Sequence, residues 1–472
     1  MQQGVKQATG LAMIGALLAG CATLPPDSRI GQGGSAPGAW TATKAGKAGI
    51  DDQWVDRFGS RDLRHLVAEA YASNRNLQAA AARVERASAV ARGAGAAARP
   101  QLNAALNGSR DKRNFIGFPG GGGGSSISNA YGASLNLQWE IDLWGKLRAG
   151  EEASLADLQA EGYTYRGARA SLAAQVVRGW LLLAEANEQI ELAENALKVR
   201  KDTAELIRSR FELAAEDAGA NASQLRLAET DVATAESALA QRQGDRDQAQ
   251  RQLEILLGRY PSAEITGSAK LPKVPKFPPA GLPSELLLRR PDILTAERRL
   301  AAAGRREDEA RLAFYPSFSL TGSGGSSTDQ LRNIFDSNFG VWSIAGQAAQ
   351  PILNGGALRS QLDTRTAEEK EALSNLQQTV LSGFGEVETA LAADRFLAER
   401  ERATGEALRI AVDGAESSAV DFGLGTGDVL TLLASQNRQI ELATQQLTLR
   451  RLRLDNRVNL HLALGGDYKI SK

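Results

Sequence analysis

The sequence contains two similar halves in the same order. The stretch from Asn76 to Leu102 is echoed by the stretch from Asp292 to Phe318, with constant spacing between matched positions. Further along, Leu143-Trp144-Gly145 corresponds to Leu353-Asn354-Gly355. Each half therefore predicts the same unit, which is a helix, two strands, a long helix and a return helix. Such a unit has an apolar edge that it cannot bury alone, so repetition implies closure by neighbouring units, within the chain or between chains.

The N-terminus predicts export. Lys6 precedes an apolar stretch from Leu11 to Leu18 that is too short to cross a bilayer as a helix, and small residues close it. We therefore interpret residues 1–20 as a cleaved signal peptide. The next residue, Cys21, is the only cysteine of the chain, so no disulfide can form within it.

The end of the signal carries a lipidation motif. Leu18-Ala19-Gly20-Cys21 resembles the lipobox of bacterial lipoproteins, in which the cysteine becomes the acylated first residue of the mature chain. The resemblance implies diacylglycerol and N-acyl groups on Cys21. Ala22 follows the cysteine, where an Asp would resemble an inner-membrane retention signal, so an outer-membrane destination is favoured. The alternative is an incidental cysteine in an ordinary secretory signal.

Composition argues against several functional classes. Lys plus Arg and Asp plus Glu are both 55, so no basic excess indicates a nucleic-acid partner. His65 and His461 lie far apart without metal-ligand spacing, and both methionines, Met1 and Met13, fall in the signal. Neither a Gly-x-Ser-x-Gly, a His-Glu-x-x-His nor a phosphate-binding Gly-x-x-x-x-Gly-Lys motif is present. We expect no enzymatic activity, no metal and no cofactor other than the covalent lipid.

Two pairs of long helices dominate the predicted organisation. Apolar and small residues recur in alternating steps of three and four from Gly145 to Phe211, which predicts a helix on the order of 100 Å long. A return helix follows as far as Leu256, and the second half repeats the pair up to Val458. Many positions on the seams are Ala, Gly or Ser, which allows close helix approach. Helices of this length also fit an elongated scaffold or spacer.

Residues 131–143 alternate between apolar and polar without a break. The odd positions are apolar and the even positions are polar or glycine: Tyr131, Ala133, Leu135, Leu137, Trp139, Ile141 and Leu143 against Gly132, Ser134, Asn136, Gln138, Glu140 and Asp142. Residues 101–107 show the same period, and weaker alternation occurs around Phe318 and around Trp342. A strand of this kind has one apolar face, and about 9–11 residues suffice to cross the hydrocarbon core of a membrane.

These four strands favour contact with lipid. Alternation alone also fits a half-buried sheet in a soluble protein. Four strands cannot close a barrel around a lumen, because about eight are needed even to fill one with side chains. Open sheet edges are not tolerated inside a bilayer, so we expect several chains to contribute to one barrel.

Four long motifs match a known family. The segment from Ser134 to Arg148 resembles the strand-to-helix signature of the TolC-like outer membrane factors, in the NodT-type lipoprotein branch of RND efflux systems. The segments Gly281 to Ile293, Ala310 to Ser317 and Leu460 to Gly466 resemble further motifs of the family, in order. The resemblance implies an α+β fold with two internal repeats and four strands per chain. It also implies a trimeric 12-stranded outer-membrane β-barrel continued by a long periplasmic α-helical barrel.

The resemblance and the repeat together predict a division of the chain. The expected parts are a signal peptide (1–20), a lipid-anchored extended segment (21–60), a first repeat (61–260) with a hairpin at 101–143, a linker (261–282), a second repeat (283–466) with a hairpin at 316–351, and a tail (467–472).

The family places control at the periplasmic tip, where long helices turn into return helices. We expect adaptor contacts at Gly423, Leu424, Gly425, Thr426 and Gly427, and gate acids at Asp421, Asp428, Glu216 and Asp217. The acid of the second turn is displaced by one position from the family pattern, and the first turn lacks the usual early glycine. Glycine-rich turns also simply reverse chains, and an exposed acid at a helix start is also an ordinary cap.

The implied function is a passive exit duct. The resemblance implies a homotrimer in outer-membrane lipid that works with a periplasmic adaptor and an inner-membrane RND-type transporter, which supplies the energy. Drugs or other small molecules are the expected cargo. A conduit for type I protein secretion and a non-conducting periplasmic scaffold are the alternatives.

Overall fold

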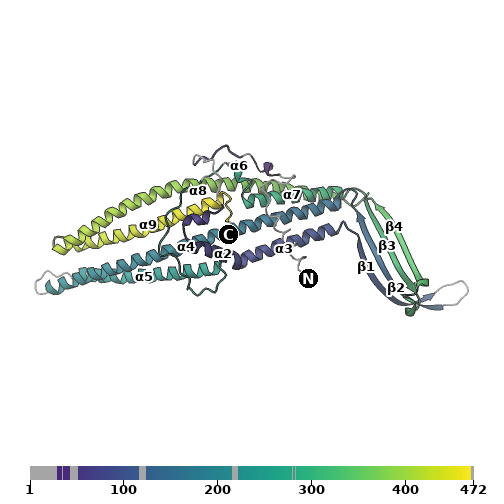
Figure 1. The fold of residues 1–472 in the computed structure, drawn as a ribbon, viewed down its shortest axis with the longest axis horizontal. Helices are drawn as coiled ribbons and strands as arrows, with labels where there is room; N and C mark the ends of the chain where they lie inside the picture. Colours follow the sequence, from purple (N-terminus) through teal and green to yellow (C-terminus); the bar gives the residue numbers. More distant parts are fainter. Residues whose placement is uncertain are drawn as a thin grey trace, which may run out of the picture.

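The protein is a long helical body with a four-stranded sheet that bends away from one end (Figure 1). The structure is a computed structural model and describes residues 29–34, 36–42, 52–115, 124–214, 222–278, 280–281 and 283–468. Its elements are η1 (Ile30–Gly33), η2 (Trp54–Phe58), α2 (Arg61–Ser73), α3 (Arg75–Ala96), β1 (Gln101–Phe115), β2 (Gly124–Ile141), α4 (Lys146–Ala214), α5 (Ala222–Leu256), α6 (Pro283–Leu286), α7 (Pro291–Leu312), β3 (Ser317–Thr328), η3 (Leu331–Asn333), η4 (Ser337–Phe339), β4 (Gly340–Ala349), α8 (Ala357–Leu424) and α9 (Val429–Ala463).

The order of helix, strand, strand, long helix and return helix occurs twice, as α3-β1-β2-α4-α5 and as α7-β3-β4-α8-α9. Helices α4 and α8 contain 69 and 68 residues, so each spans on the order of 100 Å. The predicted helix from Gly145 to Phe211 is confirmed and continues to Ala214. Within the described part of the chain, no helix is both long and apolar enough to cross a membrane.

Helices α3, α4, α5, α7, α8 and α9 pack side by side in one layer, onto which α2 packs. Helix α4 packs against α3 and α7 near the sheet and against α5 and α9 towards the tip, and α8 packs against α7 and α9. The return helix α5 ends where α3 begins, and the return helix α9 ends where α7 begins. Asn74 caps α3 by accepting from Leu77 N at 3.0 Å, and its Nδ2 donates to the carbonyl of Leu256, the last residue of α5, at 2.8 Å.

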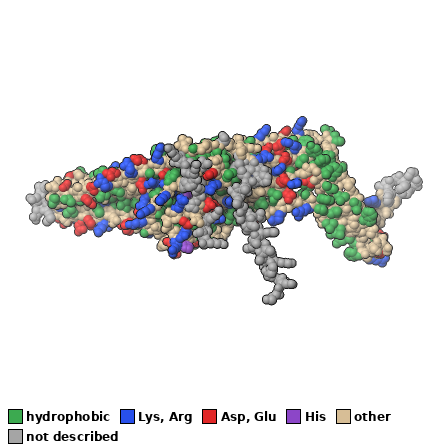
Figure 2. Space-filling view, turned by 45° about the horizontal axis from the view of Figure 1, so that its top comes forward, with side chains coloured by type: hydrophobic (Ala, Val, Ile, Leu, Met, Phe, Trp, Pro, Cys, Tyr) green, Lys and Arg blue, Asp and Glu red, His purple; other side chains and the backbone are tan. Residues whose placement is uncertain are grey.

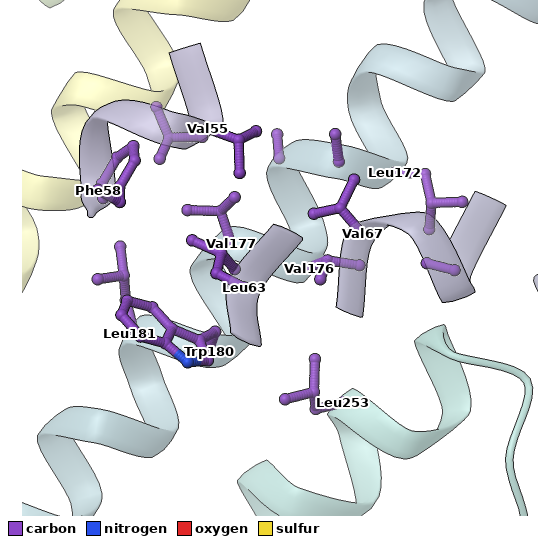
Figure 3. Close-up of a cluster of buried hydrophobic side chains, with 14 of the residues drawn as sticks. Val55, Phe58, Leu63, Val67, Leu172, Val176, Val177, Trp180, Leu181 and Leu253 are labelled. Carbon is purple, nitrogen blue, oxygen red and sulfur yellow. The ribbon is translucent and has the colours of Figure 1, made fainter. Parts of the chain in front are cut away.

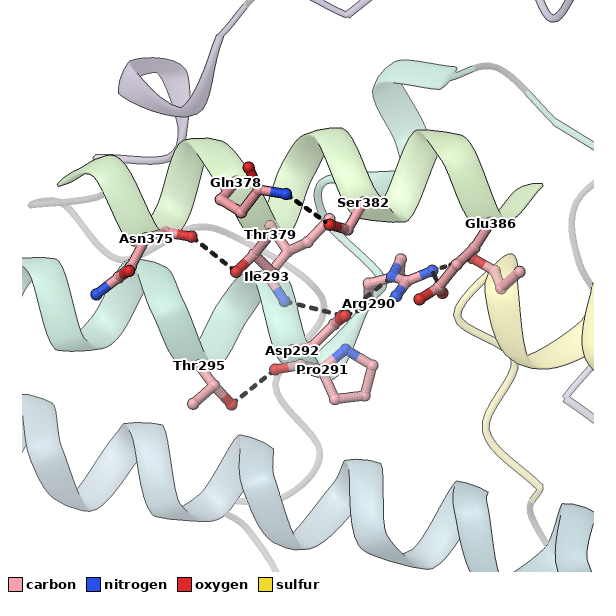
Figure 4. Close-up of polar contacts among 11 residues, drawn as sticks. Arg290, Pro291, Asp292, Ile293, Thr295, Asn375, Gln378, Thr379, Ser382 and Glu386 are labelled. Atoms are coloured by element: carbon pink, nitrogen blue, oxygen red, sulfur yellow. Dashed lines mark hydrogen bonds and ion pairs between the residues drawn. The ribbon is translucent and has the colours of Figure 1, made fainter. Parts of the chain in front are cut away.

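The second half has an equivalent junction between α9 and α7. Arg290, immediately before α7, donates through Nη1 to the carbonyl of Ala463, the last residue of α9, at 3.1 Å. The same guanidinium is buried and pairs with Asp292 at 2.6 Å and with Glu386 of α8 at 2.7 Å (Figure 4). One arginine therefore fixes the end of α9, the start of α7 and the middle of α8.

The sheet has the order β1-β2-β3-β4 with antiparallel neighbours. Its register aligns Leu102, Leu137, Gly322 and Ile344 across the four strands. Since residues directly opposite share a face, the alternating apolar positions of all four strands come together on one side. That side also carries Ala104, Leu106, Tyr131, Ala133, Leu135, Trp139, Ile141, Phe318, Leu320 and Trp342. The predicted one-sided sheet is confirmed.

The first hairpin ends earlier than its expected limit of 143. Strand β2 stops at Ile141 because the carboxylate of Asp142 turns to the start of α4. It accepts from Leu147 N at 3.1 Å and from Arg148 N at 2.8 Å, which satisfies two amides of the first helical turn. The second pair of strands covers Ser317–Thr328 and Gly340–Ala349, within the expected 316–351.

The main core lies at the waist of the helical body (Figure 3). Helix α2 packs onto α4 through Leu63 and Val67, both fully buried. Trp54 of η2 is also fully buried, and Tyr468 is 1% exposed in the same cluster. The expectation of an extended segment at 21–60 is therefore wrong at its end, and the expected tail 467–472 begins inside the core.

Candidate functional site: the strand sheet and the helical tip

One face of the sheet is an exposed apolar surface. On the single chain Leu106 is 76% exposed and Trp342 is 80% exposed. Figure 2 shows hydrophobic side chains gathered over the sheet, whereas charged side chains are spread along the helical body. An apolar surface of this size on a soluble chain would be costly in water.

The opposite face of the sheet is polar. Ser323 and Ser343 lie across from each other and their hydroxyls are 2.8 Å apart. On the neighbouring strands, Asn103 lies opposite Asn136, which in turn lies opposite Ser323. The pattern of one apolar and one polar face is that of a barrel strand with lipid outside and water inside.

Aromatic side chains lie where the strands join the helices. The indole of Trp139 donates to the carbonyl of Ala98 at 3.0 Å, and that of Trp144 donates to the carbonyl of Pro316 at 2.8 Å. The rings of Trp144 and Tyr315 have centroids 5.4 Å apart. Amphipathic aromatics of this kind favour the interface between lipid and water.

Both outer strands of the sheet have a free edge. Among the described strands, β1 pairs only with β2 and β4 only with β3. Unpaired N–H and C=O groups at a sheet edge inside a membrane must find partners. Among the described residues, both edges of this sheet are left unpaired.

The second tip, between α8 and α9, is a tight turn built on Asp421. Gly425 adopts φ +81°, a left-handed conformation that favours glycine, and its N–H donates to Phe422 O at 3.1 Å. The amides of Thr426 and Gly427 both donate to Asp421 O at 3.0 Å. Two of the three predicted glycines are thus required by the turn itself, because a Cβ at Gly427 would meet Phe422 N at 2.7 Å.

The remaining tip residues are available on the surface. A Cβ at Gly423 would meet nothing within 4 Å, and Leu424 is 75% exposed. Asp421 and Asp428 are both exposed. The carboxylate of Asp428 caps α9 by accepting from Thr431 N at 3.2 Å, so this acid has a structural role whether or not it also acts in a gate.

The sequence did not indicate a contact between the two helical hairpins at the tip. Arg210 of α4 donates through Nη2 to the carbonyls of Phe422 at 2.5 Å and Gly423 at 3.0 Å. Its guanidinium lies 4.3 Å from the centroid of the Phe422 ring. A cation at the C-terminal end of α8 is electrostatically favourable. The only signal in the sequence is an arginine near the end of a predicted helix.

Three of the predicted site residues belong to the N-terminus and to the first tip, between α4 and α5. Cys21, Glu216 and Asp217 lie outside the described residues. Close to the first tip, the carboxylate of Glu229 accepts hydrogen bonds from Arg208 at 3.0 Å and Arg226 at 2.8 Å. These two arginines hold the pKa of Glu229 below its usual range.

Comparison with known proteins places these features in a family. A family model described as outer membrane efflux protein matches residues 66–259 and 282–466. The probable efflux pump outer membrane protein SepC of Pseudomonas putida is 30% identical over 472 residues, covering 96% of this chain and 95% of SepC. The probable outer membrane lipoprotein SilC of Salmonella typhimurium is 29% identical over 466 residues, covering 96% of this chain and 97% of SilC.

The fold agrees with a solved channel. The structure of the outer-membrane channel OprN matches with a TM-score of 0.84 at 26% identity, covering 94% of this chain and 99% of that chain. The resemblance found in the four sequence motifs is confirmed. The chain belongs to the outer membrane efflux protein family, the outer-membrane channel components of efflux pumps.

Proposed function

We propose that three copies of this chain form a passive exit duct for drugs or other small molecules. The observation that carries the proposal is the sheet, which is apolar on one face, polar on the other and open at both edges. Pairing β4 of one copy with β1 of the next satisfies these edges. Three copies give a barrel of twelve strands, which is wide enough to enclose a water-filled lumen.

The helical layer would continue the duct into the periplasm. Its columns are α3 followed by α5, α4, α7 followed by α9, and α8. Four columns from each of three copies give a tunnel of twelve helices. A continuous aqueous path needs no catalysis, so we propose that an inner-membrane RND-type transporter supplies the energy and a periplasmic adaptor joins it to the duct.

The tip would be the point of control. We propose that Gly423, Leu424 and Thr426 contact the adaptor, with Gly425 and Gly427 shaping the turn that presents them. Threefold rings of like charge would form from the tip acids, and their mutual repulsion would tune the closed state. The proposed acids are Asp421, Asp428, Glu216 and Asp217.

Acylation of Cys21 would add a lipid anchor to the barrel. The relative SilC is named an outer membrane lipoprotein, which supports this proposal. The anchor and the sheet would then hold the chain in the same membrane by two independent attachments.

Reconstitution of the purified mature protein tests the duct. We expect a trimer that resists heating in detergent and ion conductance across planar lipid bilayers. A trimer without conductance would favour the non-conducting scaffold. A mature chain that stays soluble and monomeric without detergent would overturn the proposal. Loss of protein secretion, but not of drug efflux, on gene deletion would favour the type I secretion conduit.

A further inference from the structure

A polar stripe on α4 faces away from the core. The residues of α4 that pack beneath α2 and η2 include Val176, Val177 and Trp180 (Figure 3). At about 100° per residue, a second set lies on the opposite side of the helix. Of this set, Gln175 and Leu182 are exposed and Ser171 and Arg178 are half-buried, whereas Glu185 and Gln189 are buried against α9. Since the covered side of the helical layer cannot line a lumen, the uncovered side is the wall of the proposed duct.

An open groove of about 610 Å³ lies on this uncovered side, between α4, α8 and α9. Its lining mixes polar side chains with apolar ones such as Ala390 and Leu462. Arg178 comes from α4, the residues from α8 include Ser382, Glu386 and Thr389, and those from α9 include Asn456 and Asn459.

Arg178 supplies a positive charge to this groove, and the carboxylate of Asp455 offsets that charge only in part. Among the described residues it forms no ion pair, and its Nη2 donates to the neutral side chain of Asn459. The carboxylate on the other wall, Glu386, is paired with Arg290 at 2.7 Å. Between α4 and α9, Arg451 of α9 is paired with both Glu185 of α4 and Asp455 of α9. The groove therefore presents a positive charge that has no direct carboxylate partner among the described residues and that lies beside amide and hydroxyl groups.

We propose that this groove is a binding site for small organic carboxylates in the wall of the duct. A guanidinium binds a carboxylate through two parallel hydrogen bonds, and the hydroxyl of Ser382 adds a donor nearby. The inference rests on the proposed function, because only assembly of three copies turns this face into a tunnel wall. Three sites would then lie at one level and raise the local concentration of anionic cargo.

A titratable group next to the site makes its strength depend on pH. Asp455 lies one helical turn before Asn459 on α9. It faces Arg451 on its own helix and Arg178 and Glu185 on α4, and burial raises its pKa to about 6. Above that pH the ionised carboxylate partly offsets the charge of Arg178. Below it Asp455 is neutral, so attraction of anions increases on acidification.

Thiol modification at a single introduced cysteine measures the potential of the groove. The trimer is reconstituted with Thr389→Cys in a Cys21→Ser background, which leaves one cysteine per chain. Anionic and cationic methanethiosulfonate reagents then compete for it. We expect Arg178→Gln to lower the ratio of anionic to cationic rates about three- to tenfold, and Arg178→Lys to preserve it. Arg64→Gln is the matched control, because it removes the same charge from α2 on the covered side.

Two further measurements complete the test. Sodium benzoate, as the probe carboxylate, should slow modification by a neutral thiol reagent with Arg178 present and have no effect in Arg178→Gln. Lowering the pH from about 7.5 to about 5 should raise the rate ratio, and Asp455→Asn should remove that dependence.

The outcomes separate the site from the duct. A conducting trimer whose rate ratio is unchanged by Arg178→Gln, or in which Thr389→Cys reacts with neither reagent, overturns the carboxylate site alone. Absence of benzoate protection does the same. A chain that forms no conducting trimer overturns the proposed duct and this site with it.

Discussion

The sheet and the waist differ in how their apolar side chains are covered. At the waist, Leu63 and Leu181 are fully buried by residues of the same chain. In the sheet, Leu106 and Trp342 remain 76% and 80% exposed. The waist is therefore buried within one chain, whereas the apolar face and both edges of the sheet stay uncovered among the described residues.

We expect the largest effect from a charge placed on the apolar face of the sheet. Leu135→Arg places a charge on the apolar face, where an arginine near the middle of a bilayer costs about 2–4 kcal/mol in every copy. We expect the heat-resistant trimer to disappear from the outer-membrane fraction. The neighbouring Asn136→Arg points to the polar face and should leave the trimer intact. Equal loss in both variants would contradict the assignment of faces.

Leu181→Ala tests the waist in the same manner. Because Leu181 is fully buried, the truncation should lower the free energy of unfolding by about 2–5 kcal/mol, measured by thermal or denaturant unfolding of the helical signal. Membrane insertion of the sheet should be retained. Leu182→Ala, one residue on and 38% exposed, should change stability by less than about 1 kcal/mol. Similar losses at both positions would show that α4 is buried on both sides.

We expect a smaller effect at the tip, where two substitutions of Asp428 separate its capping of α9 from its negative charge. Asp428→Ala removes the cap of α9 and should cost about 1 kcal/mol, together with higher single-channel conductance or leak of large antibiotics. Asp428→Asn keeps a capping oxygen but removes the charge, so it should raise conductance with little loss of stability. If neither variant changes the closed state, Asp428 is a cap and not part of a gate.

Cys21→Ser should have the smallest effect on assembly. We expect incorporation of labelled palmitate to be abolished while heat-resistant trimers persist, because the sheet carries its own attachment to the membrane. Loss of trimers in this variant would mean that the anchor is required for the sheet to reach the bilayer.

The parts of the fold that repeat along the chain could be predicted from the sequence. The alternation at 131–141 and the ladder of α4 are local patterns whose period fixes the exposed and buried sides. Contacts between distant segments could not be predicted. Arg210 meets the end of α8 more than 200 residues later, and Tyr468 fills the core beside Trp54. Such pairings depend on how the helices are placed in space and leave no periodic signal.

The same limit applies to the candidate site. The sequence indicated an acidic and glycine-rich tip, but it did not show which glycines the turn requires. The structure shows that Gly425 adopts a left-handed φ, whereas a Cβ at Gly423 would meet open space. The charge of Arg178 could not be assessed from the sequence either, because its surroundings come from three helices.

The two junctions at Asn74 and Arg290 have a mechanical consequence. At each one, two helices meet end to end through a side-chain hydrogen bond to a terminal carbonyl, with no shared backbone. Such a junction contains no helical backbone hydrogen bond that bending would break, whereas α4 and α8 are continuous helices along their whole length. The end of the molecule farthest from the sheet is thus joined to the strands by unbroken helix only through α4 and α8, and the other two columns depend on these side-chain contacts.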